Sequence, residues 1–207
     1  MFSQFCFQDK ALLKFAVDDY VAQNCTNNPG CEVGQTYGWP IGTWCVSQVT
    51  DMSYLFQNKD TFNEDLSGWD VSSVTAMWGM FEGTREFNGN VSNWNTTSVI
   101  DTGGMFNGAA AFNIDISSWD VSSVWDMGGM FSGAASFDAN ISSWDVSSAL
   151  YMNYLFYEAT SFHQDLCSWG DKFPYRQAND IFVGSGCTFQ EDPQIDQQGP
   201  FCASSCN

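Results

Sequence analysis

The stretch that decides the fold reads Ile116-Ser-Ser-Trp119-Asp-Val121-Ser-Ser-Val124-Trp-Asp-Met127-Gly-Gly-Met130-Phe131 and continues to Asn140. Its first apolar residues are spaced three, two and three positions apart, which predicts a short strand that points Ile116, Trp119 and Val121 inward. From Val124 the spacing suits one or two helical turns, and Ser123 with Asp126 resembles a capping box. One unit therefore predicts a short strand, a short helix and a return loop.

The same pattern recurs every 25 residues along most of the chain. Such a unit cannot bury its apolar face alone, so stacked units must share one core and place their aromatic side chains in columns along the stack. Four series carry the period, and they comprise Trp44, Trp69, Trp94, Trp119, Trp144 and Trp169; Phe56, Phe81, Phe106, Phe131 and Phe156; Phe62, Phe87, Phe112, Phe137 and Phe162; and Ile41, Leu66, Val91, Ile116, Ile141 and Leu166.

The period divides the chain into three parts. Residues 1–40 predict an N-terminal helical cap, with an amphipathic helix that begins near Asp9. Residues 166–207 predict a degenerate sixth coil and a C-terminal cap, since terminal repeats must cover exposed core. Between the caps lie five predicted coils, at residues 41–65, 66–90, 91–115, 116–140 and 141–165. The expected fold is a right-handed repeat solenoid with a short parallel strand and a short helix in each coil.

Four of the eight cysteines lie near the front of the chain and four near its end, which predicts disulfide bonds that hold the two ends of the stack together. Disulfides indicate an oxidising compartment, so we expect a secreted or cell-surface protein. If the bridges stay within each cap, three connectivities remain open at each end. Zinc is the alternative, but the single histidine, His163, lies inside the repeats. The candidate bridging residues are Cys6, Cys25, Cys31, Cys45, Cys167, Cys187, Cys202 and Cys206.

The charge of the chain excludes several classes of partner. There are 24 acidic and 6 basic residues, which gives a formal net charge of −18. Such a surface repels nucleic acid and anionic membranes. No apolar run reaches the roughly 20 residues that span a bilayer, so membrane insertion is not expected. Four sequons predict a glycoprotein, with acceptors at Asn24, Asn90, Asn95 and Asn140.

The outward positions of the predicted strands form a polar stripe on the expected concave face. The stripe comprises Asp70, Asn95, Asp120 and Asp145, each followed two residues later by a hydroxyl from Ser72, Thr97, Ser122 or Ser147. Stacked carboxylates repel one another, so this stripe predicts a docking surface for a ligand, or a calcium site at Asp120 and Asp145. The alternative is structural, since Asp commonly fixes a turn by accepting hydrogen bonds from the backbone and from Ser.

A second polar series precedes each predicted strand. The same structural alternative applies to it, and its members are Asp65, Asn90, Asp115, Asn140 and Asp165. Catalytic constellations are scarce, because His163 is the only residue through which a histidine-based triad could be built. We therefore expect no enzymatic activity and no cofactor other than calcium.

Several short segments of the repeat resemble those of a known family. Trp69-Asp-Val-Ser-Ser-Val-Thr75, the Met-Phe pairs and Phe112-Asn-Ile-Asp-Ile116 resemble the BspA-like leucine-rich-repeat surface proteins, whose repeat is also known as a mycoplasma-type domain of unknown function. The resemblance covers residues 37–190. The cysteine-bearing ends, including Gly199-Pro-Phe-Cys202, look like secreted algal members such as those of diatoms. The resemblance implies a leucine-rich-repeat-like fold, surface exposure, and adhesion or recognition without established chemistry.

The sequence thus predicts a non-enzymatic binding or adhesion module that recognises an extracellular protein or glycan through its concave strand face. One alternative is a structural extracellular protein that binds calcium or a surface through its acidic ladders. A weaker alternative is a carbohydrate-active enzyme, since paired carboxylates abound.

Overall fold

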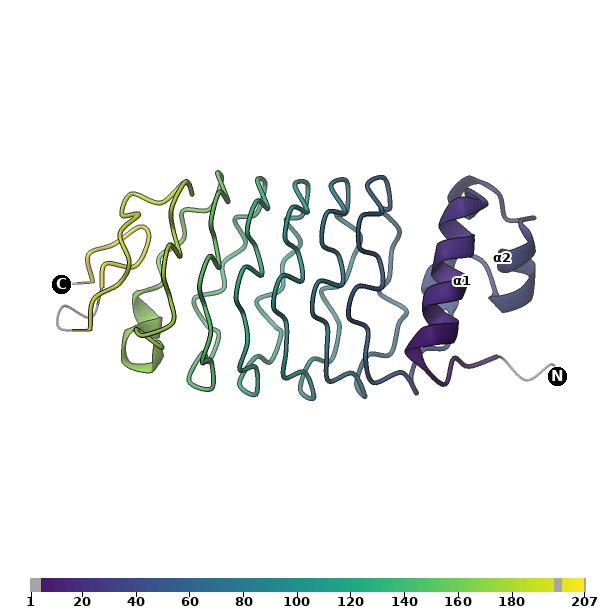
Figure 1. Ribbon diagram of the computed structural model, residues 1–207, viewed down its shortest axis with the longest axis horizontal. Helices are drawn as coiled ribbons and strands as arrows, with labels where there is room; N and C mark the ends of the chain where they lie inside the picture. The colour runs from purple at the N-terminus through teal and green to yellow at the C-terminus, as the bar shows by residue number, and fades with distance from the viewer. Residues whose placement is uncertain (1–4, 196–198, 207) are drawn as a thin grey trace.

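A computed structural model describes residues 5–195 and 199–206. Figure 1 shows a row of similar coils stacked along one axis, with two helices at the N-terminal end and irregular loops at the C-terminal end. The two α-helices are α1 (Lys10–Ala22) and α2 (Glu32–Tyr37). Three short 3-10 helices accompany them, η1 (Cys25–Asn27), η2 (Ile41–Thr43) and η3 (Cys167–Lys172). Over these described ranges the chain forms no β-strand.

Helix α1 is the predicted amphipathic helix of the N-terminal cap. The Asp9 carboxylate caps it by accepting a hydrogen bond from the backbone N–H of Leu12 at 2.9 Å. Its apolar side buries Leu13, Val17 and Tyr20 against the first coil. Lys10 Nζ lies 3.1 Å from Asp51 Oδ2, and this ion pair links the helix to that coil. The helix that the sequence predicted near Asp9 is therefore present.

The predicted repeat unit is wrong. No described residue of the five coils lies in a β-strand or an α-helix, so a leucine-rich-repeat-like solenoid of one short strand and one short helix per coil is not what forms. The coils consist of turns, joined to their neighbours by isolated parallel bridges. These bridges pair residues 25 apart, in the series Asp51, Ala76, Asp101, Asp126 and Tyr151. The predicted boundaries of the coils and caps stay predictions.

Hydrogen bonds between coils are concentrated in one part of each coil, which we call the ladder segment (residues 50–58 and their equivalents at 25-residue intervals). The backbone N–H groups of Met52, Tyr54, Phe56 and Asn58 donate to carbonyls in the next coil at 2.7 to 2.9 Å. Each later coil repeats this pattern, so columns of aligned peptide bonds run along the stack. The ladder segment is where the sequence predicted the short helix.

The conformation of the ladder segment explains why neither a strand nor a helix forms there. Gly104 and Gly108 have φ of 60° and 70°, in the left-handed region, and the coils on either side have glycines at the same two positions. A residue with positive φ interrupts both regular structures. Successive turns nevertheless bring residues three apart together, as in the bond from Met130 N–H to the Met127 carbonyl at 3.1 Å. The apolar spacing therefore resembles that of a helix.

The columns of peptide bonds are closed at the C-terminal end by side chains. Gly184 has no following coil, and its N–H donates to Gln190 Oε1 at 3.1 Å. Asp192 accepts from the N–H of Ile181 at 3.3 Å. Both side chains belong to the loop that follows the last coil, so this loop supplies the acceptors that another coil would otherwise provide.

The core consists of aromatic columns, as predicted. Phe81 and Phe106 stack with ring centroids 5.5 Å apart and an interplanar angle of 1°, and Phe106 also stacks on Phe112 of its own coil at 3.8 Å. The Trp119 indole N–H donates to the Val91 carbonyl, 28 residues earlier, at 3.1 Å. The other central coils repeat both contacts, so each coil is bonded to its neighbour through its core as well as through its ladder segment.

The predicted disulfides are present, and both caps have the same nested connectivity. At the N-terminal end, Cys6–Cys45 links the predicted cap to the first coil and encloses Cys25–Cys31; at the C-terminal end, Cys167–Cys206 encloses Cys187–Cys202. The zinc alternative is therefore wrong for these residues. Disulfides of this kind fit an extracellular protein.

Candidate functional site

The predicted polar stripe lies in turns rather than on a strand. All eight of its residues are exposed or partly exposed. The Asp120 carboxylate accepts hydrogen bonds from the Ser122 backbone N–H at 3.0 Å and from the Ser122 hydroxyl at 2.6 Å. Asp70 with Ser72 and Asn95 with Thr97 repeat this arrangement. The concave strand face is thus replaced by a row of side-chain-fixed turns.

The charge of this row is compensated within the protein. The hydrogen bond from the Ser122 hydroxyl lowers the pKa of Asp120, and Ser147 acts in the same way on the pKa of Asp145. Asp145 also accepts from the Ser147 N–H at 3.1 Å and pairs with Lys172 at 3.2 Å. These contacts match the structural alternative. Whether the row also binds a ligand or calcium stays a prediction.

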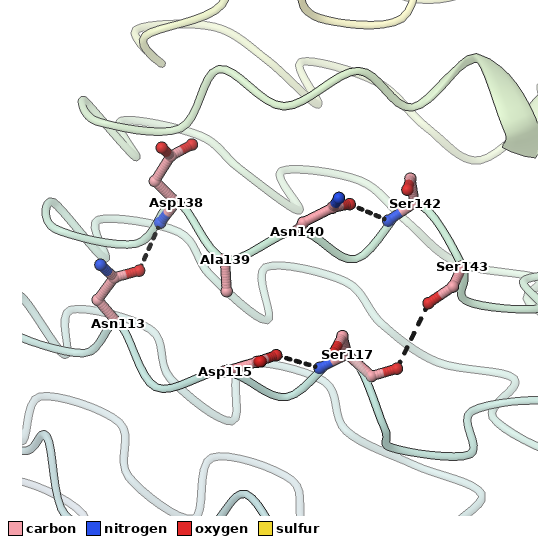
Figure 2. Close-up of a pocket in the computed structure, with 8 residues that line it drawn as sticks. All are labelled: Asn113, Asp115, Ser117, Asp138, Ala139, Asn140, Ser142 and Ser143. Carbon is pink, nitrogen blue, oxygen red and sulfur yellow. Dashed lines mark hydrogen bonds between the residues drawn. The ribbon is translucent and has the colours of Figure 1, made fainter.

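The second polar series fixes turns in the same way. Figure 2 shows a polar hollow of about 400 Å³ beside it, where Asp115 accepts from the Ser117 N–H and Asn140 from the Ser142 N–H, each at 3.0 Å. Neighbouring coils are linked there by the Asn113 side chain, which accepts from the Asp138 N–H at 2.9 Å. Most polar side chains in this hollow are engaged by the protein itself.

Three of the four predicted glycan acceptors lie in these two rows of turns. Asn90, Asn95 and Asn140 are exposed, and the hydroxyl of the third sequon residue donates to the amide oxygen at 2.8 Å in the first two. Asn24 is also exposed, at the N-cap of η1. All four acceptor asparagines are therefore exposed, and whether they carry glycans stays a prediction.

A different surface carries the exposed apolar side chains. Of the eleven large hydrophobic side chains that are exposed among the described residues, six come from one part of the ladder segment, positions 50 to 54 of the coil and their equivalents. We call this surface the aromatic face, and its members are Trp78, Ile100, Trp125, Leu150, Tyr151 and Tyr154. Clusters of this kind on a soluble protein mark interaction sites.

The aromatic face contains a hollow of about 440 Å³, which we call the aromatic hollow. Trp78 lies on its N-terminal side, Tyr151 and Tyr154 lie on its C-terminal side, and the backbone of Gly128 and Gly129 lies between them. Its complete lining is Trp78, Asn107, Asp126, Gly128, Gly129, Ser132, Tyr151, Asn153 and Tyr154. A second, more apolar hollow of about 460 Å³ adjoins it, shares Tyr151 and extends to Ile195.

Trp78 is held in place although 40% of it is exposed. Its indole packs against the backbone of Gly103 in the next coil, so closely that a Cβ at Gly103 would lie 2.5 Å from the ring. The ring also forms an edge-to-face contact with Tyr54, with centroids 4.5 Å apart. Trp78 therefore offers a rigid, partly exposed aromatic surface.

The two ends of the aromatic face depart from the pattern of the middle coils. At the position of Tyr54 and Tyr154 the three intervening coils have Gly79, Gly104 and Gly129, all with positive φ. The two tyrosines have φ of 61°, although a side chain at such φ is destabilising by about 1–2 kcal/mol. Glycine adopts this backbone conformation without that cost, and the middle coils have glycine at this position. Strain of this kind is concentrated at functional sites.

Polar groups in the aromatic hollow are less engaged than those of the turn rows. Over the described residues, neither the side-chain amide of Asn107 nor the side-chain hydroxyl of Ser132 takes part in a hydrogen bond. Asp126 accepts from the Gly128 N–H at 2.8 Å. Burial raises the pKa of Asp126, and burial likewise raises the pKa of neighbouring Asp101, to which the Asp126 charge contributes. The hollow thus combines aromatic walls with donors and acceptors that can serve a ligand.

Sequence reasoning missed this site because it assigned the aromatic residues to the core. That assignment is right for the six tryptophans of the 25-residue series, which are at most 4% exposed. Trp39, Trp78 and Trp125 fall outside the series, and all three are exposed. Their departure from the period was the available signal.

Two further groups of potentially reactive side chains stand out among the described residues. His163 is exposed, and its ring lies 3.2 Å from Asp138 Oδ1. Asp165, Cys167 and Cys206 lie close together, but the two sulfurs form a disulfide. In the described ranges, no helix is long and apolar enough to cross a membrane.

Comparison with known proteins gives a family. The family described as "Mycoplasma protein of unknown function, DUF285" matches residues 30–113 and 81–193, which together exceed half of the chain. No curated protein and no solved structure matches. The mycoplasma-type repeat of the predicted resemblance is thus confirmed, whereas the likeness to BspA-like and algal proteins stays a prediction. The chain belongs to the DUF285 repeat family.

Proposed function

We propose that this protein is a non-enzymatic extracellular recognition module, secreted or displayed at a cell surface, which binds an extracellular protein or glycan. The observation that carries the proposal is the aromatic face. Exposed Trp and Tyr side chains destabilise a monomer surface and favour association, and they are the residue types that contribute most to binding energy. Their concentration on one segment of a repeated structure supports a contact surface.

The comparison between the two surfaces favours the aromatic face as the place where the ligand binds. In the turn rows, Asp120 and its equivalents are bonded to the following Ser or Thr, so a ligand would have to compete with these hydrogen bonds. On the aromatic face, the Asn107 side-chain amide and the Ser132 hydroxyl take part in no hydrogen bond within the described residues, and both lie beside exposed apolar area. The predicted sequons at Asn90, Asn95 and Asn140 lie in the turn rows, so glycans there would leave the aromatic face uncovered.

The proposal is tested with a panel of extracellular glycans and extracellular matrix proteins immobilised on a biosensor. We expect the wild-type chain to bind at least one class, and the double variant Trp78→Ala/Tyr154→Ala to lose about tenfold or more in affinity. The matched control is Asp120→Asn/Asp145→Asn in the turn row, which should bind as the wild type does. Each ligand should be recovered chemically unchanged, because no turnover is expected.

Two results would overturn the proposal. One is the absence of saturable binding across the panel. The other is binding that is lost in Asp120→Asn/Asp145→Asn and retained in Trp78→Ala/Tyr154→Ala. Turnover of any bound glycan would show instead that the protein is an enzyme.

A further inference from the structure

We propose that the aromatic hollow is a subsite for a neutral carbohydrate, which it holds between Trp78 and the pair Tyr151 and Tyr154. This inference rests on the proposed recognition function and specifies its ligand class.

The walls of the hollow suit the faces of a sugar ring. A pyranose presents a face of C–H groups, which packs on an aromatic ring because the ring face is electron-rich. Contacts with Gly103 and Tyr54 restrict the Trp78 side chain, so it loses little conformational freedom when a ligand binds. Tyr154, which is 49% exposed, supplies a second ring on the far side of the hollow.

The floor of the hollow is open because of glycine. At the position of Trp78, the equivalent residues are Ser53, Gly103, Gly128 and Asn153, so this position accepts a side chain in other coils. Gly103 makes room for the Trp78 ring, whereas Gly128 leaves its space to the hollow. Gly129 at the neighbouring position likewise replaces the tyrosine found in the terminal coils. The backbone of the fourth coil is therefore exposed to a ligand.

The polar groups match the edge of a sugar ring, where each hydroxyl both donates and accepts. The Asn107 amide offers both roles, the Ser132 hydroxyl does so as well, and the Asp126 carboxylate accepts. Asp126 is oriented by its bond from the Gly128 N–H at 2.8 Å. A small number of placed polar groups within apolar walls is the usual composition of a small-ligand site.

Charge selects neutral carbohydrates over acidic ones. Among the described residues that line the hollow there is no Lys, Arg or His, and Asp126 is acidic. The formal charge of the whole chain is −18. Sulfated or uronic-acid glycans would meet repulsion without a compensating cation, so they should bind more weakly than neutral ones.

The experiment is a ¹⁹F NMR titration of the full disulfide-bonded chain labelled with 5-fluorotryptophan. The Trp78 resonance is assigned from its absence in Trp78→Phe. The probes are short oligosaccharides of neutral β-glucan, α-mannan and chitin, with a sulfated oligosaccharide as the charge control. We expect at least one neutral series to shift the Trp78 resonance saturably, and the sulfated probe to leave it unchanged.

Two variants and one control separate the site from the fold. Trp78→Ala should weaken binding of that oligosaccharide about tenfold or more. Gly128→Asn should weaken it strongly by occupying the floor, at a position where Ser53 and Asn153 show that a small polar side chain fits. Phe15→Ala removes an exposed ring from α1, 61% exposed and remote from the hollow, and should bind as the wild type does.

The outcomes also separate this inference from the broader proposal. If no neutral oligosaccharide shifts the Trp78 resonance, or if Gly128→Asn binds normally, the carbohydrate inference is wrong. If a matrix protein binds and that binding depends on Trp78 and Tyr154, recognition by the aromatic face survives without it. If neither ligand class binds, both are wrong.

Discussion

The left-handed backbone at Tyr154 leads to a sharp prediction about stability. We compare Tyr154→Gly with Tyr154→Ala, two variants that both remove the ring. Alanine keeps the cost of positive φ, about 1–2 kcal/mol, whereas glycine removes it. Glycine in turn loses about 0.5–1 kcal/mol more conformational entropy on folding. The Gly variant should therefore be more stable than the Ala variant, by up to about 1.5 kcal/mol.

The control position is Leu150, which is exposed on the same segment and is not among the residues with positive φ. There the order should reverse, and Leu150→Gly should be less stable than Leu150→Ala by about 0.5–1 kcal/mol. The assay is thermal unfolding with intact disulfides, followed by circular dichroism and by Trp fluorescence. A difference of 1 kcal/mol corresponds to about 2–4 °C in a chain of this size. If Tyr154→Gly melts below Tyr154→Ala, the turn conformation of the ladder segment is wrong.

Three further predictions concern the caps and the acidic residues. Replacing Cys6 and Cys45 by Ala opens a loop with a sequence separation of 39, and we expect a loss of about 4 kcal/mol in unfolding free energy, measured by urea denaturation; an unchanged midpoint would contradict it. Because burial raises the pKa of Asp126, its protonation stabilises the folded state, and that stabilisation is lost as pH rises through the raised pKa. Asp126→Asn should therefore melt above the wild type at neutral pH, and the difference should vanish as pH falls below the usual Asp range; a gain independent of pH would refute this cause. Finally, Ser hydroxyls already donate hydrogen bonds to Asp120 and Asp145. Calcium should therefore leave the melting temperature nearly unchanged. A saturable rise that disappears in Asp120→Asn/Asp145→Asn would instead establish the calcium site.

The repeat and its core were predictable because their signal is periodic. The four residue series fix which side chains face inward, and the observed Phe columns follow from them directly. The caps were predictable for a related reason, since Cys and the apolar pattern after Asp9 mark the two ends. The pairing of the cysteines was not, because sequence spacing does not tell which residues of a cap lie together.

The conformation of the coil was not predictable from apolar spacing. Turns with bonds between residues three apart, such as Met127 and Met130, place side chains almost as a helix does. The decisive residues include Gly104 and Gly129, which adopt positive φ inside the segment that was predicted to be helical. In the same way, the prediction of a strand at Ile116–Val121 did not account for Asp115 and Asp120, which fix turns at the two ends of that segment.

The candidate site was missed for a different reason. The polar stripe of Asp70, Asn95, Asp120 and Asp145 recurs with the period, and periodic residues in a repeat protein serve the repeat first. Trp78 and Tyr154 break the period, which makes them unnecessary for the fold and available for a ligand. In this chain, departures from the repeat are more informative about function than the repeat itself.

The most direct test of the central claim is a covalent footprint of the chain with and without its best-binding ligand from the panel. Carbene labelling followed by mass spectrometry reports which side chains the ligand covers. The account predicts protection at Trp78, Tyr151 and Tyr154, with unchanged labelling of the turns at Asp120 and Asp145. Protection confined to those turns, with the aromatic face labelled as before, would contradict it.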